Sequence, residues 1–196
     1  MQIPLFPLNV VLFPGGPLPL RIFETRYTDM VSERMRSDGP FGVLLIRDGK
    51  EAAGPASTFN IGTLARITDF YQGSDGLLGV TAIGEQRFRL LSSERAADGL
   101  NIGSVELLPD EPDVPLPAEF SQLADILDGV LDDLGKLYET LPRHLDRAGW
   151  VANRFIEILP IRLEEKQALL ADDNPLGRLT LVRDVLNDVR PAGDDA

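Results

Sequence analysis

Acidic side chains at helical spacing are the first residues in this sequence that could do chemistry. Asp125, Asp128 and Asp132 follow one another at steps of three and four, and Asp133 adjoins them. This spacing places three carboxylates on one face of a helix, where oxygen ligands could bind a divalent cation. The same segment carries its apolar residues on the opposite side. We therefore interpret the acidic residues as the solvated face of an amphipathic helix.

Histidine, cysteine and serine chemistry is largely excluded by composition and spacing. The 196 residues include no cysteine, which rules out thiolate zinc sites, iron–sulfur clusters and disulfides. His144 is the single histidine, and its place just after Pro142 predicts an exposed loop position. No serine lies in a G-x-S-x-G or S-x-x-K pattern, and neither a G-x-x-x-x-G-K-[ST] loop nor a G-x-G-x-x-G fingerprint occurs. We expect no catalytic residue, no metal and no cofactor.

The charge balance weakens any interpretation as a nucleic-acid or membrane binder. The formal net charge is −12, and such a surface repels phosphate backbones and anionic lipid. Arg87 and Arg89 alternate with Phe88 on a predicted strand, and could contact an anion or RNA. The alternative, which the net charge favours, is an outward sheet face paired with nearby acids.

The first 108 residues show the pattern of a small β-rich domain. The segment over residues 24–36 carries its apolar side chains at helical spacing, and predicts one helix. Turns are predicted at residues 73–76 and at Gly84-Glu85. The remaining apolar segments predict strands over residues 3–7, 17–22, 41–46, 61–72, 77–83, 87–91 and 101–108. This pattern is typical of a small antiparallel barrel or sandwich. We interpret the nearby aromatic residues as core: Phe59, Phe70 and Tyr71.

A proline-rich boundary separates this region from a helical one. Residues 109–117 hold four prolines and predict an extended, semi-rigid linker. Asp172-Asp173 before Asn174-Pro175 is interpreted as helix capping rather than a metal site. Helices are predicted over residues 118–140, 147–159, 163–171 and 174–189, which form a helical lobe over 118–190. Residues 191–196 are predicted to be a disordered tail. Residues 1–108 carry a net charge of −2 and residues 109–196 a net charge of −10, in agreement with two regions.

Neither a targeting segment nor a membrane span is predicted. The first residues lack a basic region and are interrupted by prolines, and no apolar run approaches the ~18 residues that a span needs. These observations favour a cytoplasmic, soluble protein.

Several stretches together resemble the N-terminal domain of Lon proteases. The most specific has an unusual proline spacing and opens the chain. The stretches are residues 3–15 (IPLFPLNVVLFPG), 18–27 (LPLRIFETRY), 59–67 (FNIGTLARI), 79–88 (GVTAIGEQRF) and 169–179 (LLADDNPLGRL). The resemblance spans roughly residues 3–190.

The resemblance implies an α+β fold with two lobes. The first, over residues 1–108, would be a β-rich, PUA-like pseudo-barrel with one helix, and the second a helical bundle. The implied role is recognition of an unfolded polypeptide or a protein partner. Neither the phosphate loop of the Lon ATPase module nor the Ser–Lys dyad of its protease module has matching positions. The chain thus resembles a stand-alone substrate-binding domain that is not an enzyme.

The proline-rich loop between Pro14 and Pro19 is our candidate for a peptide-binding element. A constrained apolar loop loses little entropy on binding. The candidate peptide-binding residues are Phe13, Leu18 and Phe23. The alternative is that all three fill the core beneath the sheet.

Two other functions stay open on the sequence alone. PUA-like lobes elsewhere bind nucleic acid, although the charge of this chain argues against it. An enzyme of unrecognised type would need a buried cluster of carboxylates that the sequence cannot reveal.

Overall fold

The structure is a computed structural model that describes residues 1–48, 57–73 and 76–189, with the side chain of residue 189 excepted. The chain divides into two compact units. The first, the sheet unit, comprises Met1–Asp110 and Ile161–Ala171, and the second, the helical unit, comprises Glu111–Pro160 and Asp172–Ala196. The predicted tail over residues 191–196 lies outside the described residues.

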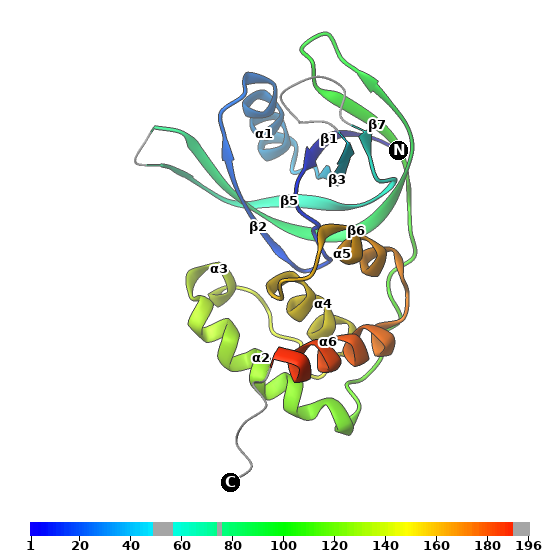
Figure 1. The fold of residues 1–196 in the computed structure, drawn as a ribbon. Coiled ribbons are helices and arrows are strands. Elements are labelled where there is room, and N and C mark those ends of the chain that lie inside the picture. Colours follow the sequence, from blue (N-terminus) through cyan, green and yellow to red (C-terminus); the bar gives the residue numbers. More distant parts are fainter. Residues whose placement is uncertain (49–56, 74–75, 190–196) are drawn as a thin grey trace. The chain divides into compact units, whose positions relative to one another are not determined.

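Five of the seven described strands of the sheet unit form a closed ring. The seven strands are β1 (Gln2–Leu8), β2 (Pro17–Ile22), β3 (Phe41–Asp48), β4 (Ser57–Thr58), β5 (Ile61–Gln72), β6 (Leu78–Arg95) and β7 (Asn101–Leu107). The order β1-β7-β6-β5-β3 closes because β1 also pairs with β3 (Figure 1). The β1–β3 pairing is parallel, unlike the antiparallel barrel that the sequence predicts. The relation to PUA-like pseudo-barrels stays a prediction.

The predicted turn at Gly84-Glu85 is wrong, because β6 runs through it without interruption. The Gly84 N–H donates to the Gly16 carbonyl over 2.8 Å, and the Gly84 carbonyl accepts the Gly15 N–H over 2.7 Å. A Cβ atom at position 84 would lie 2.3 Å from the Phe13 carbonyl oxygen. The glycine is therefore needed for the close approach of the loop to the strand rather than for a turn.

Helix α1 (Thr25–Ser37) covers the main apolar core of the sheet unit. Its buried residues Tyr27, Met30 and Val31 belong to the same cluster as Val80 and Ala82 of β6. The ring of Tyr27 stacks on Phe6 of β1 with 3.9 Å between the ring centroids. The helix ends at Asp38, whose left-handed φ of 48° lets the Gly39 N–H reach the Arg34 carbonyl.

Helix α5 (Leu163–Ala171) belongs to the sheet unit, although the sequence predicts it within a helical lobe over residues 118–190. Arg87 is buried and donates to the Leu170 carbonyl over 2.8 Å and to the Pro109 carbonyl over 3.5 Å. Gln167 donates to the Ile61 carbonyl over 3.0 Å. These long-range bonds explain the difference. They also correct the expectation that Arg87 lies on an outward face, whereas Arg89 does lie outward, 3.7 Å from Glu106.

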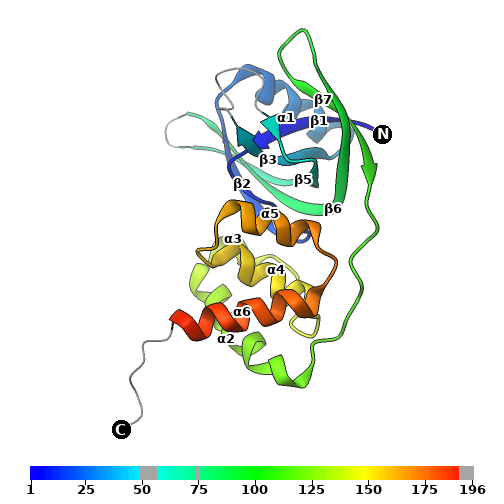
Figure 2. The same ribbon diagram turned by 45° about the vertical axis from the view of Figure 1, so that its right-hand side comes forward.

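The helical unit contains η2 (Ala118–Phe120), α2 (Ser121–Leu134), α3 (Lys136–Glu139), α4 (Ala148–Ile158) and α6 (Pro175–Val189). Helices α4 and α6 lie side by side in Figures 1 and 2. The single helix predicted over residues 118–140 is interrupted at Gly135, which has a φ of 65°. The capping prediction agrees with the structure, because Asn174 Oδ1 accepts the Gly177 N–H over 3.0 Å.

The proline-rich segment is not a free linker, because most of it is attached to the helical unit. The Val114 carbonyl accepts the Ala148 N–H, and the Leu116 N–H donates to the Asp146 carbonyl. Glu111 pairs with Arg178 of α6 over 2.6 Å, and both side chains are nearly or fully buried. Sequence composition marks the boundary between the units but does not show this attachment.

Among the helices built from described residues, none combines the length and the apolar character that a membrane crossing requires.

Candidate functional site

Exposed apolar side chains gather on the sheet unit at the two ends of α1. Phe23 follows β2 and is 72% exposed, and Met35 near the end of α1 is 39% exposed. Phe70 and Tyr71 of β5 are 60% and 49% exposed. Large apolar side chains in water are a cost to a folded protein, and several of them around cavities indicate a binding surface.

The three predicted peptide-binding residues differ in their exposure to solvent. Phe13 is 0% exposed and Leu18 is buried, so neither side chain presents a surface to a peptide. Both lie where strand and loop residues pack into the core. Phe23 is exposed, and it lines a cavity. Phe13 and Leu18 fill the core, as the alternative expects, and peptide binding by Phe23 stays a prediction.

The cavity beside Phe23 lies at the N-terminal end of α1 and measures about 90 Å³. Leu20 and Tyr27 contribute apolar walls. Arg26 fixes the neighbouring chain, because its Nε donates to Glu24 over 2.9 Å and its Nη1 donates to the Gly99 carbonyl over 3.1 Å. The cavity is smaller than the several hundred Å³ of a typical small-molecule pocket, and suits one apolar side chain.

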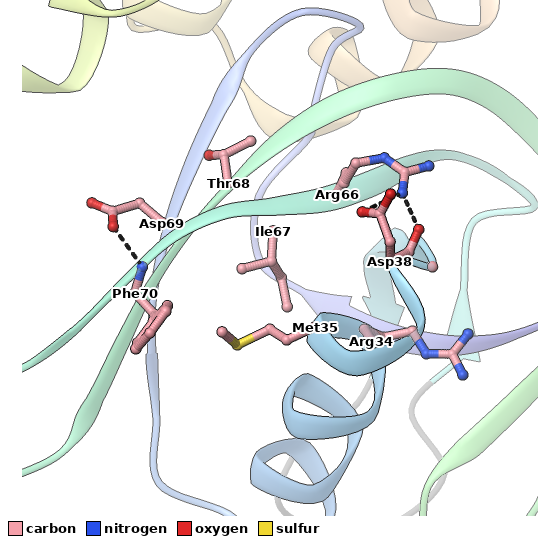
Figure 3. A pocket seen from close by; sticks show the side chains of 9 residues that line it. Arg34, Met35, Asp38, Arg66, Ile67, Thr68, Asp69 and Phe70 are labelled. Atoms are coloured by element: carbon pink, nitrogen blue, oxygen red, sulfur yellow. Dashed lines mark hydrogen bonds and ion pairs between the residues drawn. The ribbon is translucent and has the colours of Figure 1, made fainter.

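A larger cavity of about 170 Å³ lies at the C-terminal end of α1 (Figure 3). Met35 of α1 and Ile67 and Phe70 of β5 point toward one another and form its apolar floor. Arg66 stands at one end, where its Nε donates to Glu85 over 2.5 Å and its Nη1 pairs with Asp38 over 3.0 Å. Asp69 stands near the other end, and its Oδ1 accepts the Phe70 N–H over 2.8 Å.

Ion pairs keep Arg66, at the polar end of this cavity, in its charged form. The hydrogen bond to Glu85 raises the pKa of the Arg66 guanidinium, against a smaller lowering by burial and with a further rise from Asp38. The cation therefore stays charged at every physiological pH. Because Arg66 is held from two sides, it forms a fixed rim rather than a mobile charge.

The described residues offer little for bond-making chemistry. Within this part of the chain, three or more His, Asp or Glu side chains nowhere come together as a metal site would require. On the acidic face of α2, Arg143 pairs with Asp128 and, over 2.6 Å, with Asp132. His144 is exposed and meets the edge of the Trp150 ring. Each of the two cavities has apolar walls and the size to hold an apolar side chain.

Sequence reasoning missed Phe70 and Tyr71, which it assigned to the core. A signal was present, because Tyr71 pairs across the hairpin with Gly79. A Cβ atom at Gly79 would lie 2.4 Å from Tyr71 Cζ, so the ring covers the glycine on the outer face. An aromatic residue opposite a glycine is a favourable cross-strand pair, because the ring covers the backbone that the glycine leaves bare.

Comparison with known proteins points to one family. The family model for the ATP-dependent protease La (LON) substrate-binding domain matches residues 2–188. Lon protease 2 from Myxococcus xanthus is 27% identical over 192 residues, which cover 94% of this chain and 23% of that protein. Protein cereblon from Xenopus tropicalis is 33% identical over 126 residues, which cover 62% of this chain and 27% of that protein. The chain spans about a quarter of the length of these curated relatives.

Solved structures agree with this match. The Lon N-terminal domain protein from Xanthomonas campestris has a TM-score of 0.74 and 36% identity, and the match covers 93% of this chain and 96% of that one. The N-terminal domain of the Mycobacterium avium complex Lon protease has a TM-score of 0.61 at 15% identity, which supports the fold alone. Both show the same mixed architecture of helix and sheet.

Proposed function

We propose, from the premise that this chain belongs to the Lon substrate-binding domain family, that it recognises exposed apolar segments of protein substrates and catalyses no reaction. The observation that carries the proposal is the set of exposed apolar side chains around the two cavities at the ends of α1. Unfolded chains expose the apolar side chains that folded proteins bury, and such side chains fit these cavities.

Several further observations support a binding module over the other candidates. The family model concerns the substrate-binding part of Lon rather than its catalytic part. Among the described residues, no three His, Asp or Glu side chains come together in a way that could hold a metal ion. The sheet unit has 15 acidic and 12 basic residues, which favours neutral or basic polypeptides over nucleic acid. We extend the proposal to a PUA-like identity for the closed sheet and to a cytoplasmic location.

Binding of an unfolded polypeptide tests the proposal directly. Fluorescently labelled, reduced casein is titrated with the protein, and anisotropy is followed at about 50 mM and about 500 mM NaCl. Apolar recognition predicts saturable binding at both salt concentrations, because salt screens charges and leaves apolar burial intact. Absence of binding up to high micromolar protein would overturn the proposal.

A matched pair of variants locates the surface. Phe70→Ala removes an exposed ring from the larger cavity, whereas Leu91→Ala removes an equally exposed side chain from β6 outside both cavities. We expect the first to weaken casein binding at least about fivefold, or ~1 kcal/mol, and the second to leave it unchanged. Phe23→Ala should behave like Phe70→Ala. Equal effects of Phe70→Ala and Leu91→Ala would place binding elsewhere.

A further inference from the structure

Three antiparallel strands of the sheet unit, β2, β6 and β5, form a ribbon with two outer edges. The register aligns Leu20 of β2, Val80 of β6 and Phe70 of β5 in one row, and Arg21, Gly79 and Tyr71 in the next. In antiparallel pairs, residues alternate between those whose backbone groups bond the neighbour and those whose groups point away. The register is shifted between Ile67 and Asp69, but it is regular over residues 69–72 of β5 and 17–22 of β2. Within these stretches, the direction of each backbone group on the two edges follows from any one fixed pair.

The hydrogen bond beside the turn between β5 and β6 determines which backbone groups of β5 point toward β6. The Gly73 N–H donates to the Leu77 carbonyl over 2.8 Å. Two residues along each strand, Tyr71 and Gly79 form the next bonded pair, so the backbone groups of Phe70 and Gln72 point away from β6. The Phe70 N–H agrees, because it donates to Asp69 Oδ1 and not to β6 (Figure 3). Residues 68–72 are all exposed, and among the described strands β6 alone pairs with β5 here.

The outer edge of β2 is closed by proline. The same alternation turns Val80 toward Leu20, so Pro17, Pro19 and Arg21 face outward from β2. Proline has no N–H to offer, and its presence at outward positions protects a free edge against another strand. The outward residues of β5 keep their N–H groups. One edge of the ribbon is therefore blocked, and the other is open.

The open edge borders the cavity formed by Met35, Ile67 and Phe70. A strand laid along β5 would direct alternate side chains to the face that holds this cavity. The backbone edge and the cavity together select an extended segment with an apolar side chain. Neither feature alone would specify both the conformation and the side-chain type.

The charges around the cavity determine which charge the bound segment should carry, in addition to its apolar side chain. Arg66 is engaged by Glu85 and Asp38, and Arg34 is engaged by Glu33. Asp69 is exposed, and its carboxylate contacts a backbone N–H that an added strand would need. The cavity lining holds two acids, Asp38 and Asp69, and two cations, and both cations are also paired with acids outside the lining. This balance favours a segment with a basic residue, which can pair with the Asp69 carboxylate when the strand is added.

We propose that the outer edge of β5 over residues 68–72 binds an extended segment of the substrate polypeptide as an added β-strand. An apolar side chain of the segment enters the cavity, and a neighbouring lysine or arginine pairs with Asp69. This inference rests on the proposed function and specifies its substrate class and binding mode. The edge-capping contact of Asp69 keeps the free edge from pairing with other chains when substrate is absent.

Backbone methylation of a peptide tests the binding mode. The probe is a labelled, end-blocked heptapeptide of alternating lysine and phenylalanine, followed by anisotropy. One analogue carries N-methyl groups on its phenylalanines and another on its lysines. Because alternate N–H groups face β5, we expect one analogue to lose about tenfold or more in affinity and the other to stay within about threefold. A glutamate–phenylalanine peptide should bind more weakly than the parent.

Two substitutions at one exposed position provide the matched control on the protein. Gln72→Pro removes an outward N–H and leaves the ladder to β6 intact, whereas Gln72→Ala keeps that N–H. We expect the first to weaken peptide binding roughly three- to tenfold, the effect of one hydrogen bond, and the second to have little effect. Amide exchange at Gln72 should slow when peptide is bound to the unmodified protein.

The outcomes separate this inference from the proposed function. If both methylated analogues bind like the parent while casein still binds, recognition uses side chains without strand addition, and the inference alone is overturned. If neither casein nor the parent peptide binds, both the proposed function and the inference are overturned. A dimer in sedimentation that Gln72→Pro dissociates would show that a second copy of the chain occupies the edge, which also overturns the inference.

Discussion

The two units of the molecule bury arginine in different ways. In the sheet unit, Arg87 donates to the backbone carbonyls of Pro109 and Leu170. In the helical unit, Arg154 and Arg178 are fully buried beside Glu157 and Glu111. Arg87 uses hydrogen bonds to carbonyl groups to join segments that are distant in the sequence. Arg154 and Arg178 are each neutralised by a carboxylate. The buried arginine of the sheet unit therefore depends on hydrogen-bond geometry, and the buried arginines of the helical unit depend on charge balance.

The surfaces of the two units differ as well. The helical unit carries 16 acidic and 7 basic residues, for a net charge of −9, against −3 for the sheet unit. The exposed aromatic side chains Phe23, Phe70 and Tyr71 all lie on the sheet unit. A strongly charged surface resists apolar association, whereas a nearly neutral surface permits it. This difference favours the sheet unit over the helical unit as the location of the proposed recognition site.

The largest expected effect is the loss of charge balance in the helical unit. Glu111→Ala leaves Arg178 buried without its carboxylate, and we expect a loss of about 3–5 kcal/mol in the free energy of unfolding. Urea denaturation followed by circular dichroism measures it. The double variant with Arg178→Met should recover much of the loss, because the uncompensated charge is gone. A loss under about 1 kcal/mol in the single variant would show that the pair does not hold the unit together.

A smaller effect is expected when Arg87 of the sheet unit, which donates to the Leu170 and Pro109 carbonyls, is replaced. Arg87→Met leaves two carbonyls without their charged donor, and should cost about 2–3 kcal/mol. Arg89→Met, two residues along the same strand and exposed, should change stability by less than about 0.5 kcal/mol. Urea denaturation gives both values, and hydrogen exchange should show faster opening of α5 in the first variant alone. Similar values for the two variants would remove the contrast between the buried and exposed arginines.

Alkaline pH should affect the helical unit through one tyrosine. Burial, with a further contribution from Glu157 and an opposing one from Arg154, raises the pKa of Tyr138 to about 12 from 10.0. A raised folded pKa stabilises the fold fully below about pH 10, and this stabilisation is lost as the pH rises toward 12. By pH 11.5 the loss is at most about 2 kcal/mol, since one pKa unit corresponds to about 1.4 kcal/mol. Denaturation of the wild type and of Tyr138→Phe at pH 9 and pH 11.5 isolates it, and identical pH dependence in both would contradict the assignment.

Local features were predictable from the sequence, and long-range ones were not. Proline and apolar spacing predict α5 and α6 at nearly their observed bounds, because both signals act within a few residues. The place of α5 in the sheet unit depends on the bond between Arg87 and Leu170, which are far apart in the sequence. Spacing alone carries no information about such a bond. The same reason explains why Arg87 was expected on an outward face.

Candidate site residues were predicted with mixed success for a related reason. Phe13 and Leu18 are apolar residues near prolines, like Phe23, yet two of the three are buried. Burial depends on which side of β2 and its loop meets α1 and the core, and this is decided by packing. Phe70 and Tyr71 have strong β propensity, which predicts a strand but not whether the strand ends in solvent. Edge position and exposure are properties of the assembled sheet.

The smallest effect is expected on the acidic face of α2. Arg143 pairs with Asp128 and Asp132, and hydrogen bonds to Asp132 and then Asp128 raise the pKa of its guanidinium. Because Arg143 is charged in both folded and unfolded chains below pH 12, these pairs through Arg143 add no pH dependence near neutrality.

Arg143→Ala should therefore lower the thermal midpoint slightly at about 10 mM NaCl and leave it unchanged at about 1 M NaCl, where exposed charges are screened. Calorimetry at the two salt concentrations makes the measurement, with Arg162→Ala, another exposed ion pair, as the control in the sheet unit. A decrease that persists at high salt would mean that Arg143 stabilises the helical unit through packing of its stem rather than through charge. The helical unit would then share with the sheet unit a dependence on contact geometry.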